Sequence, residues 1–327
     1  MNPTSSCSET SPPPTSSTVP TYVKWQPPSR NGTLVRQPRF ERVSTIWARV
    51  KQDIASRTVT PLLPFGILPL DTLTQGLRRG KLTVLAARSS QGKTSMACQI
   101  AWSLADAKKT VAYFTLEDDR ESITERLFSH LARVDNQAMR RGLCPNNPLV
   151  EGLFDKTPLL IMDGFGYNVT EIAHVVETLS SMPDVIVVDY AQMIDDDQAE
   201  SEYRAIAVFV RHLKLFAEHA KIAVLLCSQI NRQGAQEGRP SLHHLARCGR
   251  LEEMSDTVLL LYWPHGTGDS SYDYQGTTGF APDACPRDYY ELSVEKNKTG
   301  PKGVVTLRFV GEHYRFESWA GYEDYHR

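Results

Sequence analysis

The sequence predicts an α/β fold, in which a mostly parallel β-sheet has helices on both faces and antiparallel edge strands at the C-terminus. Two observations lead to this prediction. From residue 82 onward, short apolar runs alternate with segments of helical periodicity, which is typical of a parallel sheet buried on both sides. After Tyr289 the pattern changes to an alternation of polar and apolar residues, as expected of antiparallel strands.

The individual elements follow from the same patterns. Central strands are predicted where successive residues are mostly apolar, at 82–87, 111–116, 159–162, 185–188, 222–227 and 257–262. Helices are predicted at 93–107, 118–132 and 203–219. Antiparallel strands are predicted at 290–295, 304–310 and 314–316. Residues 264–288 are rich in Gly, Asp, Pro and Ser, which predicts a long surface loop.

Two segments precede the main domain, which we place at residues 61–327. Fifteen of the first twenty residues are Ser, Thr or Pro, so residues 1–40 are expected to be largely disordered or to form a partner-binding tail. Residues 41–60 are expected to contain a linker helix. Its apolar residues recur at helical spacing and are Val43, Ile46, Trp47, Val50 and Ile54. This helix either packs on the core of its own domain or docks on a neighbouring subunit.

Composition limits the class of protein. The formal net charge is −2, which excludes an overall basic field, so any nucleic-acid site has to be local. The six cysteines show neither C-x-x-C pairs nor nearby His residues at zinc spacing. The N-terminus lacks the pattern of a signal peptide, and no apolar run is long enough to cross a bilayer. We therefore expect a reduced, intracellular, cytoplasmic protein without membrane association.

A phosphate-binding loop is predicted at residues 87–94, between a strand and a helix, which is the context that this motif requires. Its backbone N–H groups and the helix N-terminus are suited to surround the phosphates of ATP. Lys93 is expected to reach the β- and γ-phosphates, and the Thr94 hydroxyl to hold Mg²⁺. Ala87 stands where the general pattern has Gly. The residues expected to bind the nucleotide are Ser89, Ser90, Gln91, Gly92, Lys93 and Thr94.

Three polar residues at predicted strand ends complete the expected ATPase site. Asp189 closes an apolar run and fits the second carboxylate that binds Mg²⁺ together with Thr94. Glu117 ends another strand and is suited to activate the attacking water as a general base. Gln229 ends a third and is suited to sense the γ-phosphate. Each has a plainer alternative: a turn cap for Asp189, a helix-start residue for Glu117 and a polar turn for Gln229.

Several short segments, taken in order along the chain, resemble the motifs of one family. They are residues 71–77, 80–82, 87–94, 115–117, 188–192, 228–232, 249–256 and 296–301. Their sequences resemble the entry motif, Walker A, catalytic glutamate, Walker B, sensor and C-terminal basic elements of DnaB-type hexameric helicases of superfamily 4. Gly249, Leu251, Glu252 and Asp256 fall where this family has a Gly-x-Ile-Glu-x-x-x-Asp stretch. The resemblance runs from about residue 60 to the end of the chain. Several ordered motifs at matching separations are far more specific than any single motif.

The resemblance implies a RecA-like P-loop NTPase fold, a hexameric ring and ATP bound between subunits. It also implies that Lys296 and Lys298 act in trans on the γ-phosphate of a neighbouring subunit. Phosphoryl transfer benefits from such cations because they meet the charge that develops on the transferred group. Lys298 occupies the place where the family has arginine, and lysine lacks the bidentate fork of a guanidinium. The plainer alternative for both lysines is an exposed β-turn.

Two loops would face the channel of such a ring. The loop at about 194–204 is acidic and is expected to be a solvated face, since its charge would repel phosphate. The loop at about 231–249 contains arginines and glycines that are suited to follow the phosphates of single-stranded DNA. The candidate DNA-binding residues are Arg232, Arg239, Arg247 and Gly249. Arg247 is displaced by one position from its usual place in the family.

The sequence therefore indicates an ATP-dependent DNA helicase motor that translocates on single-stranded DNA and unwinds duplex DNA during replication. One alternative is a RecA-like DNA-dependent ATPase of recombination-mediator or regulatory type that does not unwind. Another is a binding module in which hydrolysis is weak, against which Lys93, Thr94, Glu117 and Asp189 argue. Residues 1–60 are too short for the N-terminal collar domain of replicative helicases. We therefore expect a stand-alone motor domain, of phage or mobile-element type or a divergent accessory ATPase, with a loader or primase as a possible partner.

Overall fold

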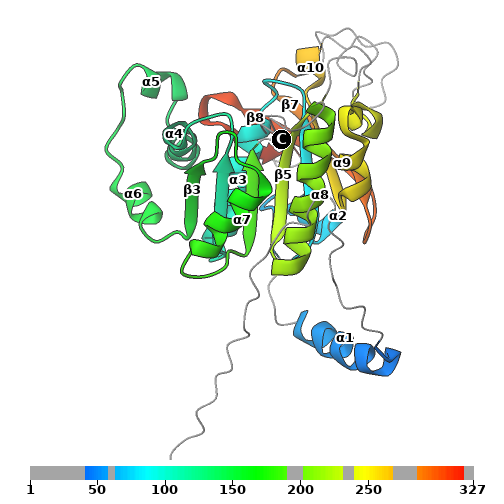
Figure 1. Cartoon of the computed structure of the whole chain (residues 1–327). Coiled ribbons are helices and arrows are strands. Elements are labelled where there is room, and N and C mark those ends of the chain that lie inside the picture. Colours follow the sequence, from blue (N-terminus) through cyan, green and yellow to red (C-terminus); the bar gives the residue numbers. More distant parts are fainter. Residues whose placement is uncertain (1–40, 58–62, 190–201, 231–238, 268–285, 320–327) are drawn as a thin grey trace, which may run out of the picture.

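The computed structural model describes residues 41–57, 63–189, 202–230, 239–267 and 286–319 (Figure 1). In these segments one sheet has the strand order β3-β2-β4-β5-β1-β6-β7-β8-β9. The strands are β1 (Leu82–Ala87), β2 (Val111–Thr115), β3 (Leu159–Asp163), β4 (Val185–Asp189), β5 (Ala223–Gln229), β6 (Thr257–Tyr262), β7 (Tyr289–Asn297), β8 (Gly303–Val310) and β9 (Arg315–Ser318). Strands β1 to β6 pair in parallel with one another. The pairs β6–β7, β7–β8 and β8–β9 are antiparallel. The predicted fold class is therefore confirmed, with strand ends shifted by at most two residues.

Helices cover both faces of the sheet (Figure 1). The core on one face includes residues of α2 (Leu68–Thr74), α3 (Lys93–Asp106) and α4 (Arg120–Ala132). The core on the other face includes residues of α7 (Val169–Thr178), α8 (Glu202–Ala220) and α9 (Gly249–Met254). Shorter elements lie in the connections and are α5 (Asn136–Arg140), α6 (Pro148–Phe154), α10 (Pro264–Thr267), η3 (Leu242–Cys248) and η5 (Gly311–His313).

Strand β1 shows why the central strands are apolar without interruption. All six of its residues are buried. Leu85 and Ala87 belong to the core on the α3 side, whereas Val84 and Ala86 belong to the core on the α8 side. Since successive side chains of a strand point to opposite faces, a strand covered on both sides needs apolar residues at nearly every position.

Helix α7 was absent from the sequence prediction, although its signals are local. Asn168 caps its first turn by accepting the Thr170 and Glu171 N–H groups at 2.8 and 3.2 Å. The Glu171 carboxylate accepts the Asn168 N–H in return, which completes a capping box. The helix then buries Val169, Ile172, Ala173 and Val176 against the sheet. A capping box followed by apolar residues at helical spacing would have predicted it.

The helix before the main domain is α1 (Val43–Arg57). Its apolar side chains do not pack on the domain: Val43 is 81% exposed and Trp47 57% exposed. Ile46 and Ile54 are exposed as well. The apolar side of α1 is therefore not covered by the described part of the chain. Of the two alternatives, the structure does not show packing of this helix on the core of its own domain.

Two of the three cysteines whose side chains the structure describes are small core residues. Cys98 and Cys227 are free thiols buried in the core, and Cys144 is free and exposed. Burial raises the pKa of Cys98 to about 12 and that of Cys227 well above its ordinary value, so both stay protonated. Among the helices that the structure describes, none has the length and apolar character needed to span a membrane.

Substitution of Phe216 tests the importance of the core under α8. Phe216→Ala is expected to lower the free energy of unfolding by about 3–5 kcal/mol, because it removes a fully buried ring from a packed face. The matched control is Val208→Ala on the same helix, where the side chain is 45% exposed and a change within about 0.5 kcal/mol is expected. Denaturant unfolding curves measure both, and equal shifts for the two variants would contradict the packing described here.

Candidate nucleotide-binding site

The residues predicted for the phosphate loop, Walker B, catalytic glutamate and sensor meet at the edge of the sheet where the parallel strands end. Ala87, at the end of β1, pairs with Gln229 at the end of β5, and Thr115 of β2 pairs with Asp189 of β4. Glu117 follows two residues after β2. Because parallel strands end at the same edge, motifs far apart in the sequence are brought together there, where α/β folds commonly bind ligands.

The loop between β1 and α3 has the backbone of a phosphate cradle. Gly92 caps α3 with a φ of 83°, and Ser90 also has a positive φ of 61°. A Cβ on Gly92 would lie 3.0 Å from a ring carbon of Phe316, so this position favours glycine for its conformation and for its space. The N–H groups of the first turn of α3 lie at this loop, together with the positive end of the helix dipole.

A pocket of about 360 Å³ opens above this loop. From the predicted set it is lined by Ser89, Ser90, Gly92, Lys93, Thr94, Glu117 and Gln229. Two of the residues predicted to bind the nucleotide do not line it. The Gln91 side chain is buried at 5% exposure, and Asp189, at 3% exposure, lies beneath Lys93.

Lys93 and Asp189 form a buried ion pair at the floor of the pocket. The Lys93 ammonium donates to Asp189 Oδ1 at 2.7 Å, and the Tyr113 hydroxyl donates to Asp189 Oδ2 at 3.0 Å. Burial acts to lower the pKa of Lys93, but the charge and hydrogen bond of Asp189 outweigh it together with the other negative groups nearby, such as Glu117. The pKa is therefore raised and the amine stays protonated. Both carboxylate oxygens of Asp189 are thus held in a fixed direction.

The residues present fit ATP with Mg²⁺. A protonated lysine beside the N–H groups at the start of a helix provides donors for phosphate oxygens. The Thr94 hydroxyl and the Asp189 carboxylate are hard oxygen ligands, and Mg²⁺ commonly takes one or two such protein ligands and completes its shell with phosphates and water. The cradle shape, the cation and the donor set therefore agree on a magnesium-bound nucleoside triphosphate.

Glu117 lies exposed on the wall of the pocket, where a water molecule can reach it. Partial burial raises the pKa of its carboxyl, opposed by Lys93 and assisted by Asp118 and Asp189. A carboxylate with a raised pKa is a better proton acceptor than an ordinary one, provided that it is ionised at the working pH. The Leu116 N–H donates to the Asp189 carbonyl oxygen at 2.6 Å, which fixes the end of β2 next to β4.

Residues near the C-terminus also line the pocket, and the sequence analysis did not identify them. Phe309, Gly311 and Tyr314 come from β8, η5 and the turn before β9, and Arg126 comes from α4. The Arg126 guanidinium lies 4.9 Å from the centre of the Tyr314 ring. These side chains add an aromatic and cationic wall beside the phosphate loop. No local motif marks them, because they reach the site only through the order of the strands.

Lys296 and Lys298 lie away from this pocket, at the opposite edge of the sheet. The Lys298 N–H donates to the Asp256 carbonyl oxygen, and the Asp256 N–H donates to that of Leu82, the first residue of β1. The pocket lies at the other end of β1, beyond Ala87. Neither lysine lines the pocket of its own chain. A catalytic role for them therefore requires the nucleotide of another copy of the chain.

The candidate DNA-binding residues are only partly described. Arg232 and most of the 194–204 loop lie outside the described residues. Arg239 is 2.9 Å from Glu291 of β7 in an ion pair. Arg247 lies in η3, and Gly249 is the first residue of α9. The described part of the 231–249 segment therefore packs beside α8 and β7 rather than in the pocket.

Comparisons with known proteins agree with this site. The model of the DnaB-like helicase C terminal domain family matches residues 63–318. The chain is 31% identical over 269 residues to the replicative DNA helicase DnaB of Leifsonia xyli subsp. xyli, covering 79% of this chain and 56% of that protein. It is 31% identical over 274 residues to the DnaB of Haemophilus influenzae, covering 80% and 56%. The chain thus spans about half the length of these curated relatives.

Solved structures show the same fold. One of them, described as an ATPase domain, superposes with a TM-score of 0.73 at 24% identity, covering 86% of this chain and 99% of that domain. A DnaB-like replicative helicase, solved in a study of its interactions with primase, superposes with a TM-score of 0.70 at 24% identity, covering 85% and 67%. The fold is accordingly RecA-like. With its phosphate loop, its buried Lys93–Asp189 pair and a family match over most of its length, this chain belongs to the DnaB-like helicase C-terminal domain family.

Proposed function

We propose that this chain is the motor of an ATP-dependent DNA helicase, which translocates on single-stranded DNA and unwinds duplex DNA during replication. The observation that carries the proposal is the pocket in which Lys93, Thr94, Glu117 and Gln229 meet, in a chain of the DnaB-like family. Relatives named replicative DNA helicase support the same activity.

The residues of the pocket divide the chemistry between them. The N–H groups of the loop and Lys93 bind the phosphates, and Thr94 and Asp189 hold Mg²⁺, which neutralises charge on the β- and γ-phosphates when it is bound. Glu117 orients the attacking water and accepts its proton. Tyr113 keeps Asp189 in a fixed orientation while Lys93 exchanges this carboxylate for phosphate oxygens.

Gln229 is suited to report the state of the nucleotide. It lies at the end of β5, beside Ala87 and at the wall of the pocket, and the 231–249 segment follows it closely in the chain. An amide that contacts the γ-phosphate moves when that phosphate leaves, and the segment attached to it moves as well. This connection would convert hydrolysis into movement of Arg232, Arg239, Arg247 and Gly249 along the DNA backbone.

A cation beyond Lys93 would assist phosphoryl transfer by meeting the charge that develops on the transferred group. We propose that a neighbouring copy supplies it through Lys296 and Lys298, in a ring that is most simply a hexamer. The name of one structural neighbour links a DnaB-like helicase with primase. A primase or a helicase loader is therefore the partner class that we propose, in the cytoplasm where replication occurs.

A forked-duplex assay tests the proposed function. The wild-type protein is expected to separate the strands with ATP and Mg²⁺, and Lys93→Ala is expected to abolish this, because the phosphates lose their principal cation. Lys156→Ala, which changes an exposed lysine outside the pocket, is the matched control and should unwind normally. Hydrolysis without strand separation would instead favour a RecA-like DNA-dependent ATPase of the recombination-mediator or regulatory type.

Glu117 is tested by an isosteric change. Glu117→Gln is expected to keep nucleotide affinity and to lower the turnover of ATP by roughly 10²–10⁴-fold, since it removes a general base and leaves the phosphate contacts in place. A fluorescent nucleotide measures binding and a phosphate-release assay measures turnover. Glu151→Gln, an exposed change on α6, serves as the control. Turnover within twofold of the wild type would remove Glu117 from the chemical step.

Lys298 is tested by removal of its charge and by its replacement with arginine. Lys298→Ala is expected to spare nucleotide binding and to lower turnover by roughly tenfold or more, because the developing charge loses its cation from the neighbouring subunit. Lys298→Arg is expected to keep or raise turnover, because the guanidinium adds a bidentate fork. Lys302→Ala, on the same turn between β7 and β8, is the control. Unchanged turnover in Lys298→Ala would show that this lysine lies outside the site.

A further inference from the structure

We propose that Asp256 is a positioning residue for ATP hydrolysis, which holds the Lys298 turn in place for the nucleotide of the neighbouring subunit. This inference rests on the proposed action of Lys298 in trans. Asp256 lies between α9 and β6, at the edge of the sheet opposite the pocket. It closes the 249–256 segment that resembles a motif of the family, and neither the catalytic nor the binding residues predicted from the sequence include it.

The main chain of Asp256 connects two strands that matter for the site. Its N–H donates to the Leu82 carbonyl oxygen at 2.8 Å, and its own carbonyl oxygen accepts the Lys298 N–H at 2.9 Å. One oxygen of its carboxylate accepts the Leu82 N–H at 3.0 Å. The start of β1 and the turn that carries Lys298 are therefore bound to the same buried residue.

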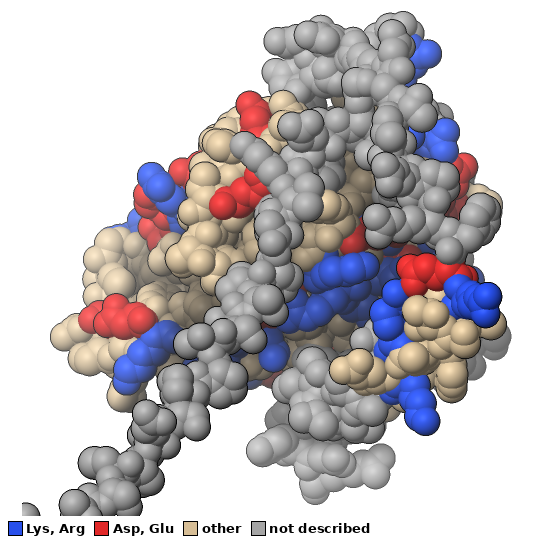
Figure 2. All heavy atoms as spheres, turned by 60° about the horizontal axis from the view of Figure 1, so that its bottom comes forward, with Lys and Arg blue, Asp and Glu red and all other residues tan. Residues whose placement is uncertain are grey.

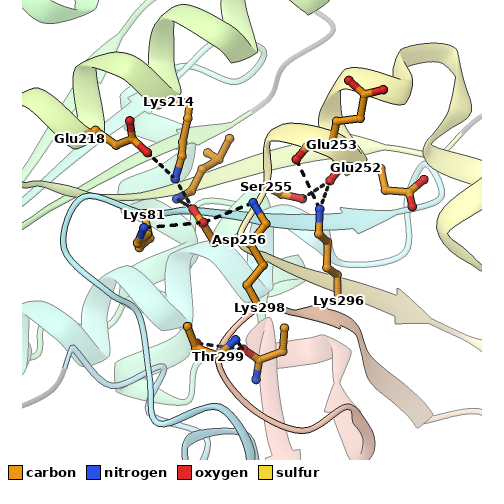
Figure 3. A network of polar contacts seen from close by, with 12 residues as sticks. Lys81, Lys214, Glu218, Glu252, Glu253, Ser255, Asp256, Lys296, Lys298 and Thr299 are labelled. Atoms are coloured by element: carbon orange, nitrogen blue, oxygen red, sulfur yellow. Dashed lines mark hydrogen bonds and ion pairs between the residues drawn. The ribbon is translucent and has the colours of Figure 1, made fainter. Parts of the chain in front are cut away.

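The carboxylate of Asp256 is surrounded by three lysines (Figure 3). Lys214 of α8 makes the closest contact, to Oδ2. Lys298 Nζ lies 3.5 Å and Lys81 Nζ 3.9 Å from Oδ1. Burial acts to raise the pKa of Asp256, but its hydrogen bonds with Lys214 and Leu82 and the lysine charges outweigh it, so the pKa is lowered. The carboxylate therefore stays ionised and keeps its hold on the lysines.

At the edge of the sheet around Asp256, two of the three lysines are accessible on the surface. Figure 2 brings this edge forward and shows a band of Lys and Arg side chains across it. The side chain of Lys298 is 46% exposed and that of Lys81 is 43% exposed, whereas that of Lys214 is only 10% exposed. Lys298 is thus restrained by Asp256 and is still accessible to an anion brought by another copy of this chain.

The restraint that Asp256 places on Lys298 is useful because this position holds a lysine in place of an arginine. A lysine has a flexible four-carbon stem and no fixed fork, so it loses more freedom than arginine for each hydrogen bond that it makes with phosphate. A carboxylate beside the ammonium limits the directions in which the stem points before the phosphate arrives. The triphosphate of the neighbour carries more negative charge than one carboxylate and can attract the ammonium, while the main-chain bond of Lys298 stays in place.

Lys296 has a separate anchor. Its ammonium donates to the carbonyl oxygens of Glu252 and Glu253 at the end of α9, the latter at 3.5 Å. Burial and the charge of Lys298 lower the pKa of Lys296. Substitution of Asp256 is therefore expected to disturb Lys298 while leaving the contacts of Lys296 with α9.

The first test is Asp256→Asn in the full chain. The amide keeps an oxygen that accepts the Leu82 N–H, and it removes the charge that holds Lys298. Affinity for a fluorescent ATP analogue is expected to stay within about twofold of the wild type, while turnover falls by roughly tenfold or more. Glu218→Gln is the control, because it removes the second carboxylate near Lys214, at 3.4 Å, without touching Lys298. Full turnover in folded Asp256→Asn would overturn the proposal.

The second test separates positioning in trans from a local structural defect. Asp256→Asn and Lys93→Ala chains, carrying different tags, are co-expressed and purified through both tags. Each variant alone is expected to turn over slowly. In the mixed assembly, the intact phosphate loop of an Asp256→Asn subunit meets the intact Lys298 turn of a Lys93→Ala subunit, so turnover is expected to return. A defect that mixing does not repair would place the effect within the altered subunit and would overturn the proposal.

A second mixture of variants distinguishes failure of the positioning role of Asp256 from failure of the action of Lys298 in trans. Lys298→Ala mixed with Lys93→Ala should regain turnover if Lys298 acts in trans. If this pair regains turnover and the Asp256→Asn pair does not, the positioning role fails and the proposed function stands. If no pair regains turnover, the action in trans itself fails. Should Asp256→Asn not fold, Asp256→Glu, which displaces the carboxylate by one methylene, is used in the same mixture, and normal turnover of this variant would likewise overturn the proposal.

Discussion

The buried pair of Lys93 and Asp189 is the interaction on which the rest of the site depends. Lys93 begins α3 directly after the β1 loop, and Asp189 ends β4; because β1 and β4 lie on either side of β5, the pair forms only when this strand order is complete. Both side chains are largely buried, and removal of one partner would leave an uncompensated charge in the core. The Tyr113 hydroxyl adds β2 to the same contact. The nucleotide site is therefore complete only when these strands are paired in this order.

Strand β1 connects the two ends of the proposed mechanism. Its last residue, Ala87, leads into the phosphate loop and pairs with Gln229, while its first residue, Leu82, forms two hydrogen bonds with Asp256. All six residues of the strand are buried, and the strand is paired on both sides. A strand packed in this way resists deformation. It therefore sets the distance between the phosphate loop and the turn that we propose offers Lys298 to the next subunit, as a ring of identical active sites would require.

The sequence predicted those parts of the site that are local. The phosphate loop, Glu117, Asp189 and Gln229 each lie beside an apolar strand, so that pattern and position together indicated their roles. Phe309 and Tyr314 could not be predicted, because pairing of β8 and β9 far along the chain forms that wall of the pocket. Arg126 of α4 joins the same wall beside the Tyr314 ring, a contact that no local pattern indicates. The same holds for Asp256, whose partners Leu82 and Lys214 are distant in sequence. For α1, periodicity predicted the helix correctly, but it contains no information on what covers an apolar side.

The three lysines around Asp256 also explain how Lys298 could leave at a low energetic cost. A buried carboxylate with a single partner would become an unpaired charge once that partner moved away. Here Lys214 keeps its contact with Oδ2, and Lys81 remains near Oδ1, so Asp256 stays neutralised after Lys298 has turned to a phosphate. Lys214 is further held by Glu218. An isolated Asp–Lys pair would have fixed the lysine to its own subunit. Three lysines around one carboxylate restrain Lys298 and still allow it to leave Asp256 for a phosphate oxygen.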